Sequence, residues 1–256
     1  MNPIKLGIIF LGLLLLTYFG LSTITPEIRK SSGQRMKGLE ATGVENLIQE
    51  KIKQLNEVQK AELNILNTKI SAAASDADKL ELLKKISGFW FGLEAYSISG
   101  SYAQKVAEIE KTAESWKIAG TTFLYGLESE TDEKQKLFCQ QMAVSSFEQA
   151  LSFQPDQADF EMYRALAYVK LPGSEPMKGI RMLLDLEKKY PQYVPLQIQL
   201  AELGMQTGQF DKAEARIRKV LDAESEHERA NCLMVALLEQ TQRKQEIEKY
   251  IIHCKQ

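Results

Sequence analysis

One long apolar run stands near the N-terminus, where residues 6–24 carry no charged side chain. A helix of about 20 apolar residues crosses a hydrocarbon core about 30 Å thick. The run therefore predicts a transmembrane signal-anchor over residues 1–25. Two alternatives stay open: a cleaved secretory signal, which the small residues Gly20 and Ser22 would suit, and a buried core helix.

The charges beside this run bear on which side of the membrane the rest of the chain lies. Lys5 precedes the run, whereas Arg29, Lys30, Arg35 and Lys37 come after it. A literal count of positive charges would keep the C-terminal part in the cytosol. A short stub with one lysine before the apolar run is, however, typical of a signal-anchor that exports the C-terminal part of its chain. We favour a single-pass protein of the bacterial inner membrane with a periplasmic C-terminal domain.

Two segments with different patterns come after the apolar run. Residues 26–43 are polar, contain glycine and lack apolar periodicity, which predicts a linker. Over residues 44–75, apolar side chains recur at steps of three and four, which predicts a long amphipathic helix. This helix either packs on its own domain or pairs with a partner. Lys51 and Glu62 interrupt the apolar stripe and weaken the coiled-coil interpretation.

The remaining chain reads as a succession of helices. One is expected from about Asp76 to Ile98, a stop at Gly100 and Ser101, and another through Val106. Neither a sustained two-residue alternation nor an Asn-Gly or Asp-Gly hairpin signal occurs. The sequence therefore predicts an all-α fold.

A recurring spacing of apolar and small residues organises the helical part over residues 76–256. The clearest copy comprises Leu200, Ala201, Gly208, Phe210, Ala213, Ile217 and Val220. This spacing resembles the tetratricopeptide repeat (TPR), a helix pair of about 34 residues. In that pattern a large and a small residue pack the first helix, a glycine turns the chain, and a small residue lets the second helix approach. Ser225 stands where the pattern has a closing proline.

Other copies of the spacing extend the array in both directions. An earlier copy contains Trp116, Ala119, Gly120, Phe123, Ala143, Phe147, Ala150 and Pro155. Clear repeats are expected over about 113–157, 158–193 and 194–227, with degraded units over about 85–112 and 228–252. Terminal repeats are expected to be atypical because one of their sides faces water. The polar segment at about 126–136 is extra, and it predicts a longer loop or additional helical turns.

The resemblance implies a TPR-like α-solenoid of antiparallel helix pairs, whose first helices line a concave groove. The family's groove positions fall here on Lys117, Thr121, Leu124, Arg164, Tyr168, Leu171, Ile198, Glu202 and Met205. This amphipathic set suits an extended peptide or a partner helix. Some members bind a C-terminal carboxylate with a Lys/Asn/Arg clamp. Thr121 and Pro195 depart from that clamp, which we therefore do not predict.

The residues needed for catalysis or metal binding are sparse. Cys139, Cys232 and Cys254 are odd in number and lack CxxC spacing, so we expect no disulfide framework, and Cys139 and Cys232 are interpreted as core residues. Cys232, His253 and Cys254 would supply three zinc ligands at most, where a structural site needs four. With two histidines and no phosphate-binding loop or HExxH motif, we predict neither an enzyme nor a bound metal or cofactor.

These observations favour a membrane-anchored TPR scaffold or adaptor that binds other proteins in the bacterial cell envelope. A translocon-associated or chaperone-like accessory would have this layout. The alternatives are a structural assembly subunit of an envelope complex, a subunit for c-type cytochrome maturation, and a scaffold facing the cytosol. A net charge of −2 argues against a broadly basic nucleic-acid-binding surface.

Overall fold

The computed structural model describes residues 43–254, which contain helices and no strand. The chain forms two compact units, Met1–Asn56 and Glu57–Gln256. The predicted signal-anchor at 1–25 lies outside the described residues, as does the predicted linker apart from its last residue. None of the helices within 43–254 has both the length and the apolar character that a membrane crossing requires.

The single long helix expected over residues 44–75 is instead two helices. The first covers residues 43–54, and the second, α3, covers Glu57–Ala72. Leu55 and Asn56 between them are not helical. Asparagine is favoured just before a helix, and an acidic residue such as Glu57 stabilises the positive end of the helix dipole. These two residues together favour the start of a new helix at Glu57, which explains why the first helix ends at residue 54.

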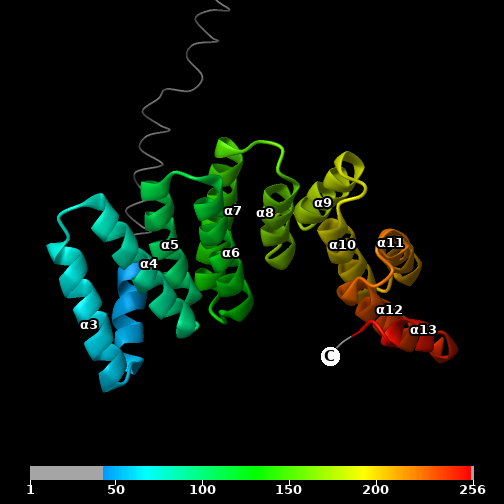
Figure 1. The fold of residues 1–256 in the computed structure, drawn as a ribbon, viewed down its shortest axis with the longest axis horizontal. Coiled ribbons are helices and arrows are strands. Elements are labelled where there is room, and N and C mark those ends of the chain that lie inside the picture. The colour runs from blue at the N-terminus through cyan, green and yellow to red at the C-terminus, as the bar shows by residue number, and fades with distance from the viewer. Residues whose placement is uncertain (1–42, 255–256) are drawn as a thin grey trace, which may run out of the picture. The chain divides into compact units, whose positions relative to one another are not determined.

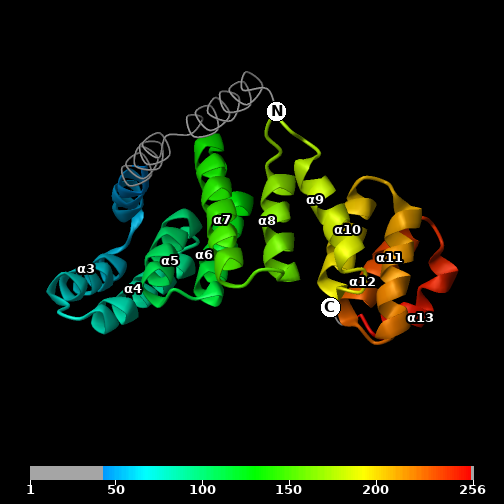
Figure 2. The ribbon, with the colours of Figure 1, turned by 90° about the horizontal axis from the view of Figure 1, so that it is seen from above.

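The second unit continues as a series of helices, each packed against the next one along the chain (Figure 1, Figure 2). They are α4 (Asp76–Gly92), α5 (Tyr96–Glu110), α6 (Ala113–Ser129), α7 (Glu133–Phe153), α8 (Ala158–Lys170), α9 (Lys178–Lys189), α10 (Val194–Gln206), α11 (Phe210–Ala223), α12 (Glu228–Gln240), the 3-10 turn η1 (Lys244–Glu246) and α13 (Glu248–Ile251).

Several of these helices begin at a side chain that accepts a hydrogen bond from the first turn. Ser75 accepts from the Asp78 amide at the start of α4, and Thr112 accepts from the Ser115 amide at the start of α6. Asp132 does the same for α7. These short polar side chains satisfy amides that have no partner within the helix. They therefore define where the chain turns back into the stack.

The helix break expected at Gly100 lies elsewhere. The chain turns at residues 93–95, where Glu94 has a φ of 57°, and Gly100 lies inside α5. A Cβ atom on Gly100 would be 2.8 Å from the Phe123 ring of α6. The glycine therefore allows α5 and α6 to pack closely, and it does not end a helix.

The extra segment at about 126–136 forms additional helical turns. α6 and α7 have 17 and 21 residues, compared with 13 and 14 in α10 and α11. The acidic stretch lies at the end of α6, in the following turn and at the start of α7. Of the two outcomes expected from the sequence, the structure has the longer helices.

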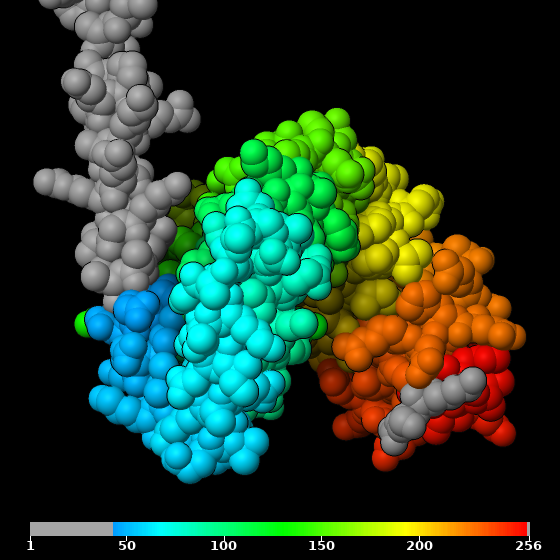
Figure 3. Space-filling model, turned by 60° about the vertical axis from the view of Figure 1, so that its left-hand side comes forward, coloured from blue at the N-terminus to red at the C-terminus, as the bar shows by residue number. Residues whose placement is uncertain are grey.

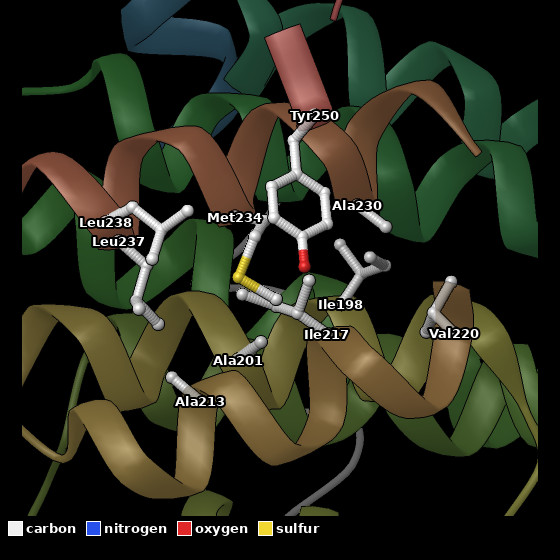
Figure 4. Packing of buried hydrophobic residues seen from close by; sticks show 10 residues of the cluster. All are labelled: Ile198, Ala201, Ala213, Ile217, Val220, Ala230, Met234, Leu237, Leu238 and Tyr250. Atoms are coloured by element: carbon white, nitrogen blue, oxygen red, sulfur yellow. The ribbon is translucent and has the colours of Figure 1, made fainter. Parts of the chain in front are cut away.

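The core is distributed along the stack in clusters that join neighbouring helices. In the cluster built by α10 to α13, Ile217, Met234 and Leu237 are fully buried. Figure 4 shows Tyr250 pointing from α13 toward Ile217 and Met234. Ala213 of the same cluster is also fully buried, and it faces Gly204 of α10.

Ala213→Leu is expected to lower the free energy of unfolding by about 1–3 kcal/mol, because a larger side chain would overpack the α10–α11 contact. A Cβ built on Gly204 would already be 3.2 Å from the Ala213 Cβ, so the two helices leave little room. Urea denaturation measures the effect. Ala215→Leu is the matched control, since Ala215 is exposed on the same helix. Equal stability of the two variants would contradict the packing described here.

The expectation of no disulfide is wrong. Cys232 of α12 and Cys254 form a disulfide, with their Cα atoms 4.8 Å apart and a separation of 22 positions in sequence. Cys232 is thus a bonded, half-buried residue and not a free core residue. The chain turns back after η1 and α13, which brings Cys254 beside α12. Cys139 is a free, fully buried thiol, as expected.

Candidate protein-binding surface

The exposed face of α6 differs from the predicted face, because Tyr125 is exposed and the predicted groove residue Leu124 is buried. Lys117 and Thr121 are half-buried, but Leu124 is only 7% exposed and packs in the core shared by α6, α7 and α8. The exposed apolar side chains are instead Ile118 and Tyr125. Residues 118, 121 and 125 match the three-and-four spacing of a single helix face. Leu124 is therefore a core residue, because its side of α6 packs into the cluster shared with α7 and α8.

The predicted groove residues of α8 lie at the boundary between core and solvent. Tyr168 is half-buried, and the Lys178 Nζ lies 3.9 Å from the centroid of its ring. Leu171 directly follows α8 and packs on the core of α6 and α7, while its carbonyl accepts a hydrogen bond from Gln140. Arg164 is half-buried, its Nε is itself buried without a hydrogen-bond partner, and its guanidinium group forms no ion pair within the described residues. This helix thus combines an aromatic ring with an uncommitted guanidinium group.

The predicted groove residues of α10 are mostly committed to internal contacts. Ile198 is 7% exposed and belongs to the core of α10 to α13, contrary to the expectation of an exposed position. Met205 packs at the edge of the same core. Glu202 accepts a hydrogen bond from the Arg229 Nε at 2.9 Å. The packing of α10 against α11 and α12 therefore buries side chains that the repeat spacing alone placed in the groove.

Ion pairs between successive repeats use two of the predicted groove charges. The Lys117 Nζ lies 3.1 Å from an Asp159 carboxylate oxygen, which links α6 to α8. Burial acts to lower the pKa of Lys117, but the hydrogen bond and charge of Asp159 reverse this and raise it. Glu202 and Arg229 link α10 to α12 in the same way. The structure describes all the predicted groove residues. Arg164 is the charged residue among them that forms no ion pair with another helix.

Arg164 lines a surface pocket of about 240 Å³ between α8 and α9. The other lining residues are Glu161, Met182, Asp185, Leu186 and Lys189. Lys189 is held by Asp156 at 2.5 Å and by Glu161 at 3.1 Å. Guanidinium groups bind carboxylates through two parallel hydrogen bonds, so Arg164 offers a donor for an incoming acidic group.

The surface of the second unit is hollowed between the cyan end, around α3 and α4, and the orange and red end, around α11 to α13 (Figure 3).

Sequence spacing missed Ile118 and Tyr125 as surface residues. A signal for them existed, because both lie on the side of α6 opposite Trp116 and Phe123, which the repeat pattern assigns to packing.

Burial raises the pKa of the Cys139 thiol to about 12, so this group stays protonated at neutral pH and is a poor nucleophile. Within residues 43–254 there is no cluster of three or more His, Cys, Asp or Glu side chains arranged to hold a metal ion.

No protein-family model and no curated protein matches this chain. Solved structures do resemble it. A thermophilic TPR protein of Thermus thermophilus, TTC0263, is 17% identical, with 78% of this chain and 98% of that chain covered and a TM-score of 0.51. MamA is 15% identical over 69% of this chain and 90% of its own, with a TM-score of 0.43. YrrB, described as a TPR protein with an unusual peptide-binding site, is 14% identical over 73% and 91%, with a TM-score of 0.39.

The similarity to the Thermus protein shows that this chain has a TPR-like, all-helical fold. The fold predicted from Gly208, Ala213 and the corresponding residues of the other copies is therefore confirmed.

Proposed function

We propose that this chain is a non-catalytic scaffold or adaptor that binds other polypeptides through the face formed by α6 and α8. The observation that carries this proposal is the uncommitted Arg164 one helical turn before Tyr168 on α8. An extended segment or a partner helix would place a carboxylate on Arg164 and an apolar side chain on Tyr168.

The double variant Arg164→Glu/Tyr168→Ala is expected to lower affinity for bound proteins at least tenfold, which corresponds to about 1.4 kcal/mol. Arginine and tyrosine are among the residues that most often dominate binding energy. Quantitative co-purification followed by titration of the recovered partner measures the loss. The matched control is Arg181→Glu/Leu184→Ala, since both of these residues are exposed on α9. Unchanged binding by the α8 variant, with unchanged melting, would exclude this face.

We further propose that the predicted helix at 1–25 anchors the chain in a bacterial inner membrane, with residues 57–256 on the periplasmic side. The apolar run supports the anchor. The Cys232–Cys254 bond supports the periplasmic side, because disulfides persist in oxidising compartments. A C-terminal fusion to alkaline phosphatase is then expected to be active and a GFP fusion dark. The reverse result would place the domain in the cytosol.

A structural assembly role is the second candidate, because both terminal helices of the second unit expose apolar side chains. Val58 and Ile65 of α3 are 77% and 55% exposed, and Ile251 and Ile252 at α13 are 53% and 68% exposed. If partners depend on these residues and not on Arg164, the assembly role is favoured. Cytochrome maturation remains an alternative, and it requires a client that carries CxxCH.

A further inference from the structure

Three aromatic side chains gather on the surface where α4 ends, α5 begins and α6 nears its end. Phe91 and Tyr125 are 42% and 52% exposed. The Phe91 ring centroid lies 5.0 Å from that of Tyr96 and 5.8 Å from that of Tyr125, and the two tyrosine rings are 5.6 Å apart. Because each ring contacts the other two, the three form one fixed surface, which we call the aromatic patch.

Carboxylates border the aromatic patch along the sequence. Glu94 is exposed in the tight turn between Phe91 and the start of α5. Glu128 follows Tyr125 by about one helical turn, and its carboxylate pairs with Lys170 of α8. Residues 128–133 contain four carboxylates and neither lysine nor arginine. Lys170 partners Glu128 and Lys136 partners Glu133, so within the described residues Glu130 and Asp132 are the carboxylates of this stretch that no ion pair offsets.

A hydrogen bond holds one carboxylate of this acidic border near the patch. The Ser97 hydroxyl donates to the Glu130 carboxylate, which ties the end of α6 to the first turn of α5. Ser97 directly follows Tyr96 in sequence. The Glu130 carboxylate is therefore held at the first turn of α5, at the residue that follows Tyr96.

A positive side chain fits this combination better than a neutral or an acidic one. Lysine and arginine are attracted to the faces of aromatic rings within about 6 Å, and neighbouring carboxylates strengthen that attraction. Ile118, which is 53% exposed, lies on the same face of α6 about two turns before Tyr125. An apolar residue of a ligand would thus find a contact next to the cation.

We propose that the aromatic patch binds a lysine or arginine side chain of a partner polypeptide, next to an apolar residue that contacts Ile118. This inference rests on the proposed function, since it specifies the chemistry of one part of the polypeptide bound by α6 and α8. Arg164 would accept an acidic group of the partner, and the aromatic patch would accept a basic one.

Selection of short random peptides displayed on phage against the full-length chain in mild detergent tests the proposal. We expect the retained peptides to be enriched in lysine or arginine beside an apolar residue. Replacing that basic residue by glutamine should lower affinity at least tenfold in fluorescence anisotropy. Tyr125→Leu should do the same, whereas Tyr125→Phe, which keeps the ring, should change affinity less than about twofold. The exposure of Tyr125 predicts an unchanged melting temperature for both variants.

Three results would overturn the proposal. If the selected peptides were not enriched in lysine or arginine, binding of a basic side chain by the aromatic patch would be excluded. Binding that Tyr125→Leu leaves intact but Arg164→Glu abolishes would exclude the aromatic patch while leaving the proposed function standing. Retention of no peptide would contradict both the patch and the proposed function.

Discussion

Gly179→Ala is expected to destabilise the region of α8 and α9 by about 3 kcal/mol. A Cβ atom at this position would lie 2.6 Å from the Val169 backbone nitrogen and 2.7 Å from the Ala165 carbonyl oxygen. Backbone atoms cannot rotate aside as a side chain can. The two helices would have to separate, which would loosen the core that Leu183 and Leu186 form with α10.

Gly88→Ala is the matched control for this prediction. Gly88 lies within α4, and a Cβ added there would meet no atom within 4 Å. Alanine is favoured over glycine in a helix by up to about 1 kcal/mol, so this variant should be slightly more stable than the parent chain. Urea denaturation measures both variants. If the two substitutions had the same effect, the close approach of α8 and α9 at Gly179 would be incorrect.

Cys232→Ser/Cys254→Ser is expected to destabilise the C-terminal end of the stack by about 3 kcal/mol. The estimate comes from the entropy that the cross-link removes from the unfolded chain, given the sequence separation of 22 between the cysteines. Repeats in a stack contact mainly their neighbours, so the effect should be concentrated in α12 and α13. Release of α13 would also uncover the core around Tyr250.

Hydrogen exchange followed by mass spectrometry measures this local effect. Amides of α12 and α13 should exchange faster in the double variant, whereas those of α4 to α6 should not change. Adding dithiothreitol to the parent chain should reproduce the variant, and adding it to the double variant should have no further effect. If reductant left the protection of α12 and α13 in the parent chain unchanged, the disulfide would not restrain this end.

The helix pairs could be predicted from the sequence because their packing requires particular residue sizes at fixed spacing. Ala213 and Gly120 are small where neighbouring helices touch, and a Cβ on Gly120 would lie 2.7 Å from the Phe147 ring. Gly100 was misread because a glycine marks both helix ends and close helix contacts. Only the position of the Phe123 ring distinguishes the two roles.

The details of the binding face could not be read from spacing. α6 carries buried residues around much of its circumference, so whether Leu124 or Tyr125 faces outward depends on how α7 and α8 lie against it. The partners of the groove charges are distant in sequence, as with Lys117 and Asp159, which are 42 positions apart. The disulfide depends on the fold-back of α13, for which neither cysteine has a local signal.

Photo-crosslinking from two positions of the intact chain tests most directly whether α8 presents a binding face. A photoreactive amino acid replaces Tyr168 in one sample and the exposed Lys188 of α9 in the other, and adducts formed in intact cells are identified by mass spectrometry. We expect a discrete adduct from position 168 that Arg164→Glu removes, and no such adduct from position 188. Equal adducts from both positions, or an adduct at 168 that persists with Arg164→Glu, would contradict recognition of another polypeptide by this face.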